Sequence, residues 1–265
     1  MKRILLLACA ALLTLNMYAC SRSSSRTITL AGSTAFQPFA EKLAEHYMQS
    51  NGSQRINVQG GGSAVGVQSA LSGSAQIGMA DLLKLPKEAL VLDATVVARD
   101  GIAIVVNPAN VVSDLTNEQA RDVFSGKISN WKELGGADAS IRVISREDGS
   151  GTRRSFDTLV MDDEKLAKNA LFQNSNGTIR EAVASDPDSI GYISISLVDK
   201  RVRSVSYNGV DANNGNVKKG SYKLARPIYF LTKKELSPDS KKFLDYVLSK
   251  EAQDTLEKEG LIAVK

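Results

Sequence analysis

A short stretch near the middle of the chain gathers residue types that could do chemistry. The segment SREDGSGTRRSF, residues 145–156, combines arginines, two acids, two glycines, serines and a threonine directly before a predicted helix. A serine between two glycines could be a nucleophile. Free backbone N–H groups and hydroxyls at the start of a helix, with an arginine beside them, could instead bind an anion.

The nucleophile interpretation lacks the other groups that catalysis needs. Ser150 lies between glycines, but the G-x-S-x-G spacing is absent because Asp148 stands two residues before it. His46 is the only histidine and is expected on the flank of a helix, so a serine hydrolase would have no evident base. The chain also lacks a P-loop motif, and the acidic run at 162–164 is better explained as solvated surface than as a metal cluster. We predict a protein that is not an enzyme and that needs no metal and no cofactor.

Two other strand-to-helix transitions have a composition similar to that of the opening segment. Ser33-Thr34 follows the strand TITLAG, and Ser63 follows INVQGGG, where it is expected to cap a helix over 64–71. In the first turn of a helix several backbone N–H groups have no intrahelical partner. One such turn is typical of ordinary capping. Three of them, with Arg146 beside the third, could surround one tetrahedral oxyanion with short hydrogen bonds.

Length and charge restrict the class of protein. The 265 residues, 43% of them hydrophobic, suffice for one large core or two smaller ones. The formal net charge is +4, but Lys2 and Arg3 belong to a segment that is expected to be removed. Without them, 31 basic residues face 29 acidic ones, a net charge of +2. We therefore expect no binding to nucleic acid.

The N-terminus has the three parts of an export signal. Residues 1–3 are basic, 4–15 are apolar, and Ala19 precedes Cys20. The apolar part is short for a membrane span, although a retained anchor is the alternative. Ala19-Cys20 resembles a bacterial lipobox, which predicts a signal peptide over 1–19, lipidation of Cys20 and a polar tether over 20–26.

The cysteine count fits that interpretation. Cys9 lies inside the apolar part of the signal, so the mature chain keeps only Cys20 and cannot form an internal disulfide. A zinc site built on imidazole and thiolate is equally improbable with one histidine and one cysteine. We expect an extracytoplasmic protein that is lipid-anchored to the bacterial membrane.

From Thr27 onward, strands and helices alternate, which indicates an α/β fold with function at the carboxyl ends of strands. Thr116 and Gln119 have the spacing of a capping box, and Ser237-Pro238 has that of an N-cap with proline at the first helical position. Trp131 is expected to be a packing anchor. Strands are expected at 27–33, 56–59, 75–81, 101–108, 140–145 and 190–196, and helices at 35–50, 64–71, 116–126, from Thr178, and at 239–258.

Several segments, in one order, are similar to those of a known family. These are AGSTAFQPFAEKLAE, GGGSAVGVQSALSG, AQIGMAD, VFSGKISNWKELGG, ISREDGSGTRRSF, IGYISIS and LARPIYFLT. In this order they resemble the phosphate-binding proteins of bacterial ABC importers, over about residues 27–262. The resemblance implies a two-lobed periplasmic-binding-protein fold of type II, a monomer that binds inorganic phosphate, and subunits of an ABC permease in the membrane as partners.

The resemblance also implies a set of site residues. Asp148 would orient Arg146, and Ala80 stands where many relatives have a serine, which removes one expected hydroxyl contact. The residues implied to bind phosphate are Ser33, Thr34, Ala35 through its backbone, Ser63, Asp81, Arg146, Ser150, Gly151 and Thr152.

Asp81 is the informative member because a carboxylate is an unusual group to aim at an anion. Monobasic or dibasic phosphate still carries a proton, so its P–OH can donate a hydrogen bond to a buried carboxylate. Sulfate at neutral pH has no such proton and would meet an unpaired, repelling charge. The alternative is that Asp81 is an exposed N-cap for the turn before LLKLPKEAL.

The two-lobe interpretation assigns each residue set to one side of a cleft. The first lobe is expected at 27–106 with 226–265 and the second at 107–225, with crossings near Asn107-Pro108 and at 224–227. A ligand held by both lobes favours the closed state. The alternative function is a tethered oxyanion-binding module of the same fold that serves adhesion or signalling.

Overall fold

The structure of the protein is a computed structural model that describes residues 27–264. The signal peptide expected at 1–19, Cys20 and the tether at 20–26 lie outside the described residues. Within the described part of the chain, no helix is long and apolar enough to cross a membrane.

Strands and helices alternate as expected from the sequence. In chain order the first half contains β1 (Thr27–Gly32), α2 (Gln37–Ser50), β2 (Arg55–Gln59), α3 (Ser63–Ser72), β3 (Ile77–Ala80), β4 (Asp93–Val106), β5 (Asp114–Leu115) and α4 (Asn117–Ser125). The second half contains β6 (Arg142–Arg146), α5 (Gly151–Phe156), β7 (Leu171–Gln173), α6 (Asn176–Ala184), β8 (Ser189–Ser194), β9 (Arg203–Tyr207), α7 (Asn214–Lys218), β10 (Ala225–Thr232), α8 (Pro238–Val247) and α9 (Lys250–Lys258).

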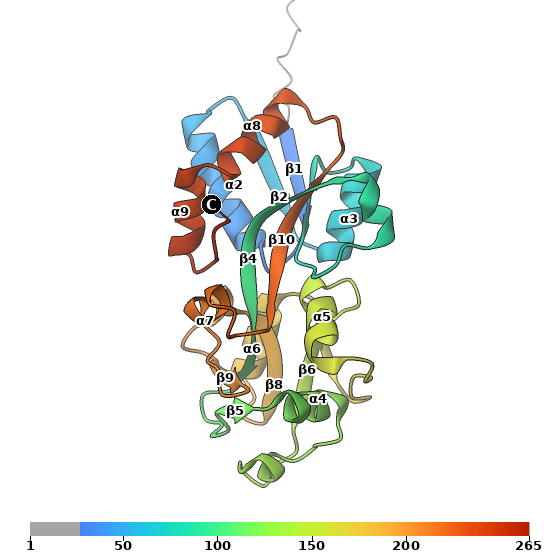
Figure 1. Ribbon diagram of the computed structural model, residues 1–265, viewed down its shortest axis with the longest axis vertical. Coiled ribbons are helices and arrows are strands. Elements are labelled where there is room, and N and C mark those ends of the chain that lie inside the picture. Colours follow the sequence, from blue (N-terminus) through green and yellow to red (C-terminus); the bar gives the residue numbers. More distant parts are fainter. Residues whose placement is uncertain (1–26, 265) are drawn as a thin grey trace, which may run out of the picture.

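The elements form two lobes that are joined by β4 and β10, as Figure 1 shows. In the first lobe the strand order is β2-β1-β3-β10-β4, with β10 antiparallel to both neighbours. In the second lobe the order continues β4-β8-β6-β7, and β9 also pairs with β4. The two-lobed α/β fold expected from the sequence is confirmed.

The first crossing between the lobes lies earlier than expected. Up to Gly101, β4 pairs with β10, whereas from Ile102 it pairs with β8. The side chains of 102–106 accordingly pack in the two cores of the second lobe. The crossing is therefore at Gly101 and not at Asn107-Pro108, because one long strand serves both sheets. On the other strand, Ala225 of β10 pairs with Gly101, so β10 begins at the level of this crossing.

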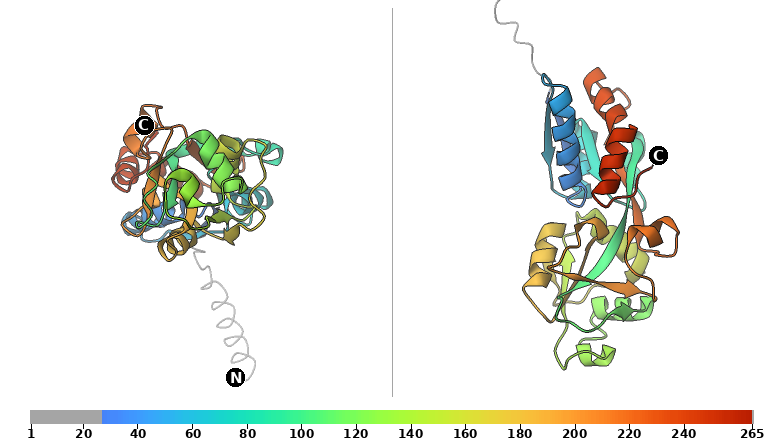
Figure 2. Two further views of the ribbon diagram at one scale, coloured as in Figure 1. Left: turned by 90° about the horizontal axis from the view of Figure 1, so that it is seen from below. Right: turned by 90° about the vertical axis from the view of Figure 1, so that its left-hand side faces the viewer.

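Each lobe has its own aromatic core. In the first, α2 packs beside α8 and α9, as the right-hand view of Figure 2 shows, and Tyr47 meets Phe243 with ring centroids 5.2 Å apart. In the second, Phe156 stacks on Tyr192 at 4.1 Å. Trp131 is buried in the same core, as expected, and its Nε1 donates to the carbonyl of Asp188 at 2.9 Å. The separate cores let each lobe move as a body about β4 and β10.

Local signals predicted some helix ends and missed others. The capping box of Thr116 and Gln119 and the N-cap Ser237 are confirmed. Ser63 is the first helical residue and not the cap, because Gly62 takes that position with φ 87°. The helix expected from Thr178 begins at Asn176, since Ser175 and Thr178 form a reciprocal cap three residues earlier. The C-terminal tail is two helices, α8 and α9, because Ser249 caps a new one.

Candidate functional site

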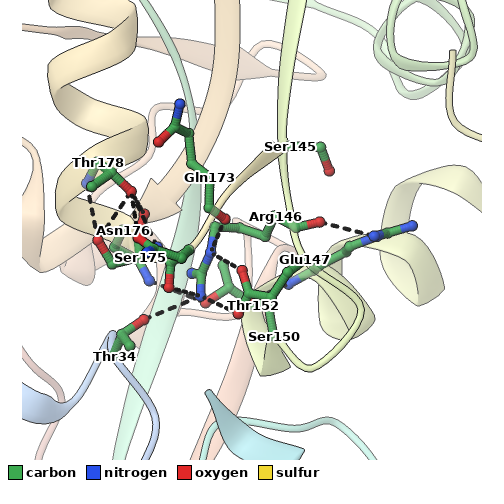
Figure 3. A network of polar contacts seen from close by, with 12 residues as sticks. Thr34, Ser145, Arg146, Glu147, Ser150, Thr152, Gln173, Ser175, Asn176 and Thr178 are labelled. Carbon is green, nitrogen blue, oxygen red and sulfur yellow. Dashed lines mark hydrogen bonds and ion pairs between the residues drawn. The ribbon is translucent and has the colours of Figure 1, made fainter. Parts of the chain in front are cut away.

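The three serine- and threonine-bearing turns meet where the lobes touch. The N–H of Ala64 in the first lobe donates to the carbonyl of Gly149 in the second at 3.1 Å. Nearby, Nη2 of Arg146 donates to Oγ1 of Thr34 at 3.2 Å, and Figure 3 shows Thr34 reaching Arg146 from the opposite lobe. These contacts cross the cleft, so the protein has a closed conformation.

Arg146 ends strand β6 and is buried, with 1% of its surface exposed. Its Nε lies 2.9 Å from Oε2 of Glu147, and its Nη2 lies 3.0 Å from Oε1 of the same residue. The carbonyls of Gln173 and Asn174 accept further hydrogen bonds from the guanidinium. Its Nη1 has no hydrogen-bond partner among the described residues. A buried N–H donor without an acceptor is costly, so Nη1 is suited to a ligand oxygen.

The residue that pairs with Arg146 is Glu147, which corrects the expected role of Asp148. The carboxylate of Asp148 is 93% exposed and pairs with Nη1 of Arg153 at 2.6 Å. Arg153 in turn donates to the carbonyl of Arg146 at 2.9 Å. Asp148 therefore acts on the backbone of the segment through Arg153 and not on the guanidinium of Arg146.

Asp81 directly follows β3 and is buried, with 1% of its surface exposed. The exposed N-cap alternative is therefore wrong. Its Oδ1 accepts from Oγ of Ser63 at 2.6 Å, and its Oδ2 accepts from Oγ1 of Thr152 at 2.9 Å. Its backbone carbonyl accepts from Oγ of Ser155 at 3.2 Å. Contacts from Thr152 and Ser155 of the second lobe thus hold Asp81 of the first in the closed cleft.

The hydroxyls of the site differ in what they can still offer. Thr152 donates to Asp81 and accepts from Nδ2 of Asn176 at 3.4 Å and from Nη2 of Arg226 at 3.3 Å, which uses all its hydrogen-bonding positions. Ser63 likewise gives its proton to Asp81. Ser150 and Ser33 only accept, from backbone N–H groups of their own turns, so their protons remain available.

Backbone N–H groups complete the donor set. Ala35, Ser63, Gly151 and Thr152 each present an N–H that has no acceptor among the described residues. The groups at Ser63, Gly151 and Thr152 lie in the first turns of α3 and α5, where intrahelical acceptors do not exist. With Nη1 of Arg146, these donors can hold the oxygens of a small anion.

Gly151 lies at a close approach between the two lobes. A Cβ there would be 2.1 Å from Oγ of Ser63 and 2.5 Å from Oδ1 of Asp81. The two side chains could turn aside, but the backbone carbonyl oxygen of Asp81 would lie 2.8 Å away and can give way only if the lobes move apart. The sequence placed Gly151 in the site for its backbone, and the structure adds a steric reason for glycine.

Gly151→Ala is therefore expected to hinder closure. We expect affinity for the anion to fall by about 10- to 100-fold, with little change in the midpoint of thermal unfolding, because the clash disappears when the cleft opens. Titration calorimetry and thermal unfolding measure the two effects. Gly177→Ala is the matched control, since the nearest atom to its Cβ would be 3.7 Å away. Equal affinities of the two variants would contradict the prediction.

Two charged residues of the site were missed in the sequence. Arg226 on β10 and Asp100 on β4 are register partners at the crossing, and both are buried. Nε of Arg226 lies 2.9 Å from Oδ2 of Asp81, and the two side chains form an ion pair, although the N–H is not aligned for a hydrogen bond. Nη2 of Arg226 lies 3.0 Å from Oδ2 of Asp100. A signal for both residues was present in the sequence, because Arg226 in ARPIYFL and Asp100 in RDGIAIVV are charged residues in otherwise largely apolar strands.

Burial raises the pKa of Asp100 from its ordinary 3.8 to about 6, against the opposing effects of Arg226 and of the hydrogen bond from Ser194. Because the pKa in the folded protein is raised, the folded state binds this proton more tightly than the unfolded chain. The contribution of Asp100 to stability is therefore complete below about pH 4 and is lost as the pH rises through about 6.

Asp100→Asn should remove this pH dependence. The free energy of unfolding is compared between the unmodified protein and the variant at each pH. We expect this difference to fall by about 3 kcal/mol as the pH rises from 4 to 7, because only the unmodified protein loses the contribution of Asp100. Urea unfolding at intervals of one pH unit measures the difference. Two curves that run parallel over this range would contradict the assignment.

The described residues contain no group of three or more His, Cys, Asp or Glu that could hold a metal ion. The groups of the site that can still reach a ligand are the N–H and O–H donors, Nη1 of Arg146 and the carboxylate of Asp81. Such a set can bind a small oxyanion that also carries a hydrogen.

Comparisons with known proteins agree with this geometry. A family model described as the PBP superfamily domain matches residues 20–251. The phosphate-binding protein PstS of Bacillus subtilis is 36% identical over 237 residues, which cover 88% of this chain and 79% of that protein.

Solved structures extend the likeness to the fold. A Clostridium perfringens protein crystallised with bound phosphate superposes with a TM-score of 0.87 at 41% identity, over 91% of this chain and 100% of that chain. An ABC-type phosphate transport receptor from Vibrio cholerae gives a TM-score of 0.75 at 36% identity, over 89% and 99%. The chain therefore belongs to the PBP superfamily, and within it to the family of phosphate-binding periplasmic proteins that contains these relatives.

Proposed function

We propose that the protein binds inorganic phosphate between its lobes, outside the cytoplasm, and delivers it to an ABC permease. The observation that carries the proposal is Nη1 of Arg146, a buried donor without an acceptor among the described residues, in a segment whose Gly151 and Thr152 also present unpaired N–H groups. The relative with bound phosphate supports the choice of ligand.

The proposed binding residues divide between the lobes. The first lobe supplies the hydroxyl of Thr34, the N–H of Ala35, and Ser63 with Asp81. The second supplies Arg146 and the turn of Ser150, Gly151 and Thr152. Ser33 lies in the same turn as Thr34, and its free proton makes it a further donor. Only the closed state presents both sets together, so phosphate stabilises closure.

Asp81 provides the selectivity in this proposal. Its Oδ1 retains one lone pair beside the hydrogen bond from Ser63, which can accept from the P–OH of phosphate. Sulfate would place a bare oxygen against the same charge. A site built around a required donor can reject an analogue that lacks it by as much as about 10⁴-fold.

Delivery follows from the two-lobed form. The closed protein would dock as a monomer on the permease and release phosphate as the lobes are pulled apart at Gly101 and at 224–227. Lipidation of Cys20, with 20–26 as a tether, would keep the protein at the membrane. The absence of a catalytic set in the sequence supports stoichiometric binding and not turnover.

Titration calorimetry with phosphate and with sulfate tests the proposal. We expect one phosphate per chain, and sulfate binding at least about 10³-fold weaker. Absence of phosphate binding would refute it. A deletion strain distinguishes import from the alternative function in adhesion or signalling. Loss of phosphate uptake in that strain would support import.

A further inference from the structure

Arg226 connects three parts of the molecule through one guanidinium. Its Nε pairs with Asp81 of the first lobe and its Nη2 with Asp100 on the crossing strand. The same Nη2 donates to Oγ1 of Thr152 in the second lobe at 3.3 Å. The side chains of Arg226 and its two carboxylate partners are 2% exposed or less.

The side chains that contact the carboxylate of Asp81 are two hydroxyl donors and one cation, which Asp81 shares with the nearby carboxylate of Asp100. Ser63 and Thr152 donate to it, and Arg226 supplies a positive charge 2.9 Å away. A charged carboxylate only accepts hydrogen bonds. A buried carboxylate also needs a positive charge to compensate its own. Arg226 is the one cation among the described residues that pairs with the carboxylate of Asp81.

We propose that Arg226 is a specificity-determining residue: it keeps Asp81 a charged acceptor and so enforces the requirement for an anion that bears a hydrogen. This inference rests on the proposed function. Without Arg226, no cation among the described residues would compensate the carboxylate of Asp81, and this side chain would no longer be held toward the ligand as an acceptor. The discrimination against sulfate would be lost even with Asp81 in place.

Asp100 positions the guanidinium. Its Oδ2 accepts from Nη2 of Arg226, and its Oδ1 accepts from Oγ of Ser194 at 2.8 Å. Ser194 lies at the end of β8 in the second lobe. Asp100 and Ser194 thereby fix the edge of Arg226 that faces Asp81.

The test compares two variants that both lack the Asp100 charge. Arg226→Met alone leaves two buried carboxylates uncompensated, which is strongly destabilising. We therefore compare Arg226→Met/Asp100→Asn with Asp100→Asn alone, after thermal unfolding has shown that both fold. Calorimetry with phosphate and sulfate at pH 7 is expected to give a preference for phosphate at least about tenfold smaller in the double variant.

A purely structural role for Arg226 would weaken both anions equally and leave the preference unchanged, which would overturn the inference. Arg226→Lys keeps the charge and is expected to keep the preference, even where affinity falls. Loss of the preference in Arg226→Lys to the level of the double variant would also overturn it. If the unmodified protein binds no phosphate, the proposed function itself fails, whereas binding with an unchanged preference in the double variant refutes only the role of Arg226.

Discussion

Arg146→Ala is expected to weaken phosphate binding by about 10²- to 10³-fold. Arg146 supplies the buried positive charge on the second-lobe side of the cleft, and charge-assisted hydrogen bonds are worth about 1.5–3 kcal/mol each. The substitution also leaves Glu147 without the guanidinium that neutralises it, only 2.9 Å from where the Nε stood. That carboxylate would then repel the anion.

Titration calorimetry measures the loss, and Arg154→Ala is the matched control. Arg154 lies in the same segment, but it is exposed, and its Nε contacts only the carbonyl of Asp148, at 3.4 Å. We expect Arg154→Ala to bind phosphate as the unmodified protein does. If Arg146→Ala and Arg154→Ala bind phosphate with similar affinity, Arg146 does not belong to the binding site.

The sequence located the binding turns because their signals are local. An apolar strand followed by small polar residues predicts a helix start, and Thr34, Ser63 and Ser150 all lie at such points. Their convergence was implied by the resemblance to a family and is confirmed by contacts such as that between Arg146 and Thr34, 112 residues apart. Local patterns predict the ends of elements but not which ends meet.

The wrong and missing predictions have a common physical origin. Each depends on which side chains or strands pair with each other in the fold, and local sequence patterns do not determine this. Glu147 and Asp148 are adjacent acids, and only the twist after β6 decides that Glu147 faces Arg146. Arg226 and Asp100 are 126 residues apart and meet through the register of β10 on β4. The crossing at Gly101 was missed because one long strand, β4, continues from the first sheet into the second, although Arg99, Asp100 and Gly101 interrupt its apolar run at that point.

Asp81→Asn is expected to reduce the preference for phosphate over sulfate by about 10²-fold or more. An asparagine in this place has no charge to repel sulfate, and its Nδ2 can donate to a sulfate oxygen. The variant should fold, because Arg226 keeps its ion pair with Asp100. Phosphate affinity should change less than sulfate affinity, since the other donors of the site remain.

The two affinities measured side by side decide between this role and a structural one. Asp148→Asn is the control, as it removes an acid of the same region whose side chain is 93% exposed. That variant should keep the preference of the unmodified protein. If Asp81→Asn binds both anions more weakly by the same factor, the carboxylate of Asp81 only holds the lobes together through Thr152. A gain in sulfate affinity, by contrast, cannot come from a loosened closure, because loosening weakens every ligand that bridges the lobes.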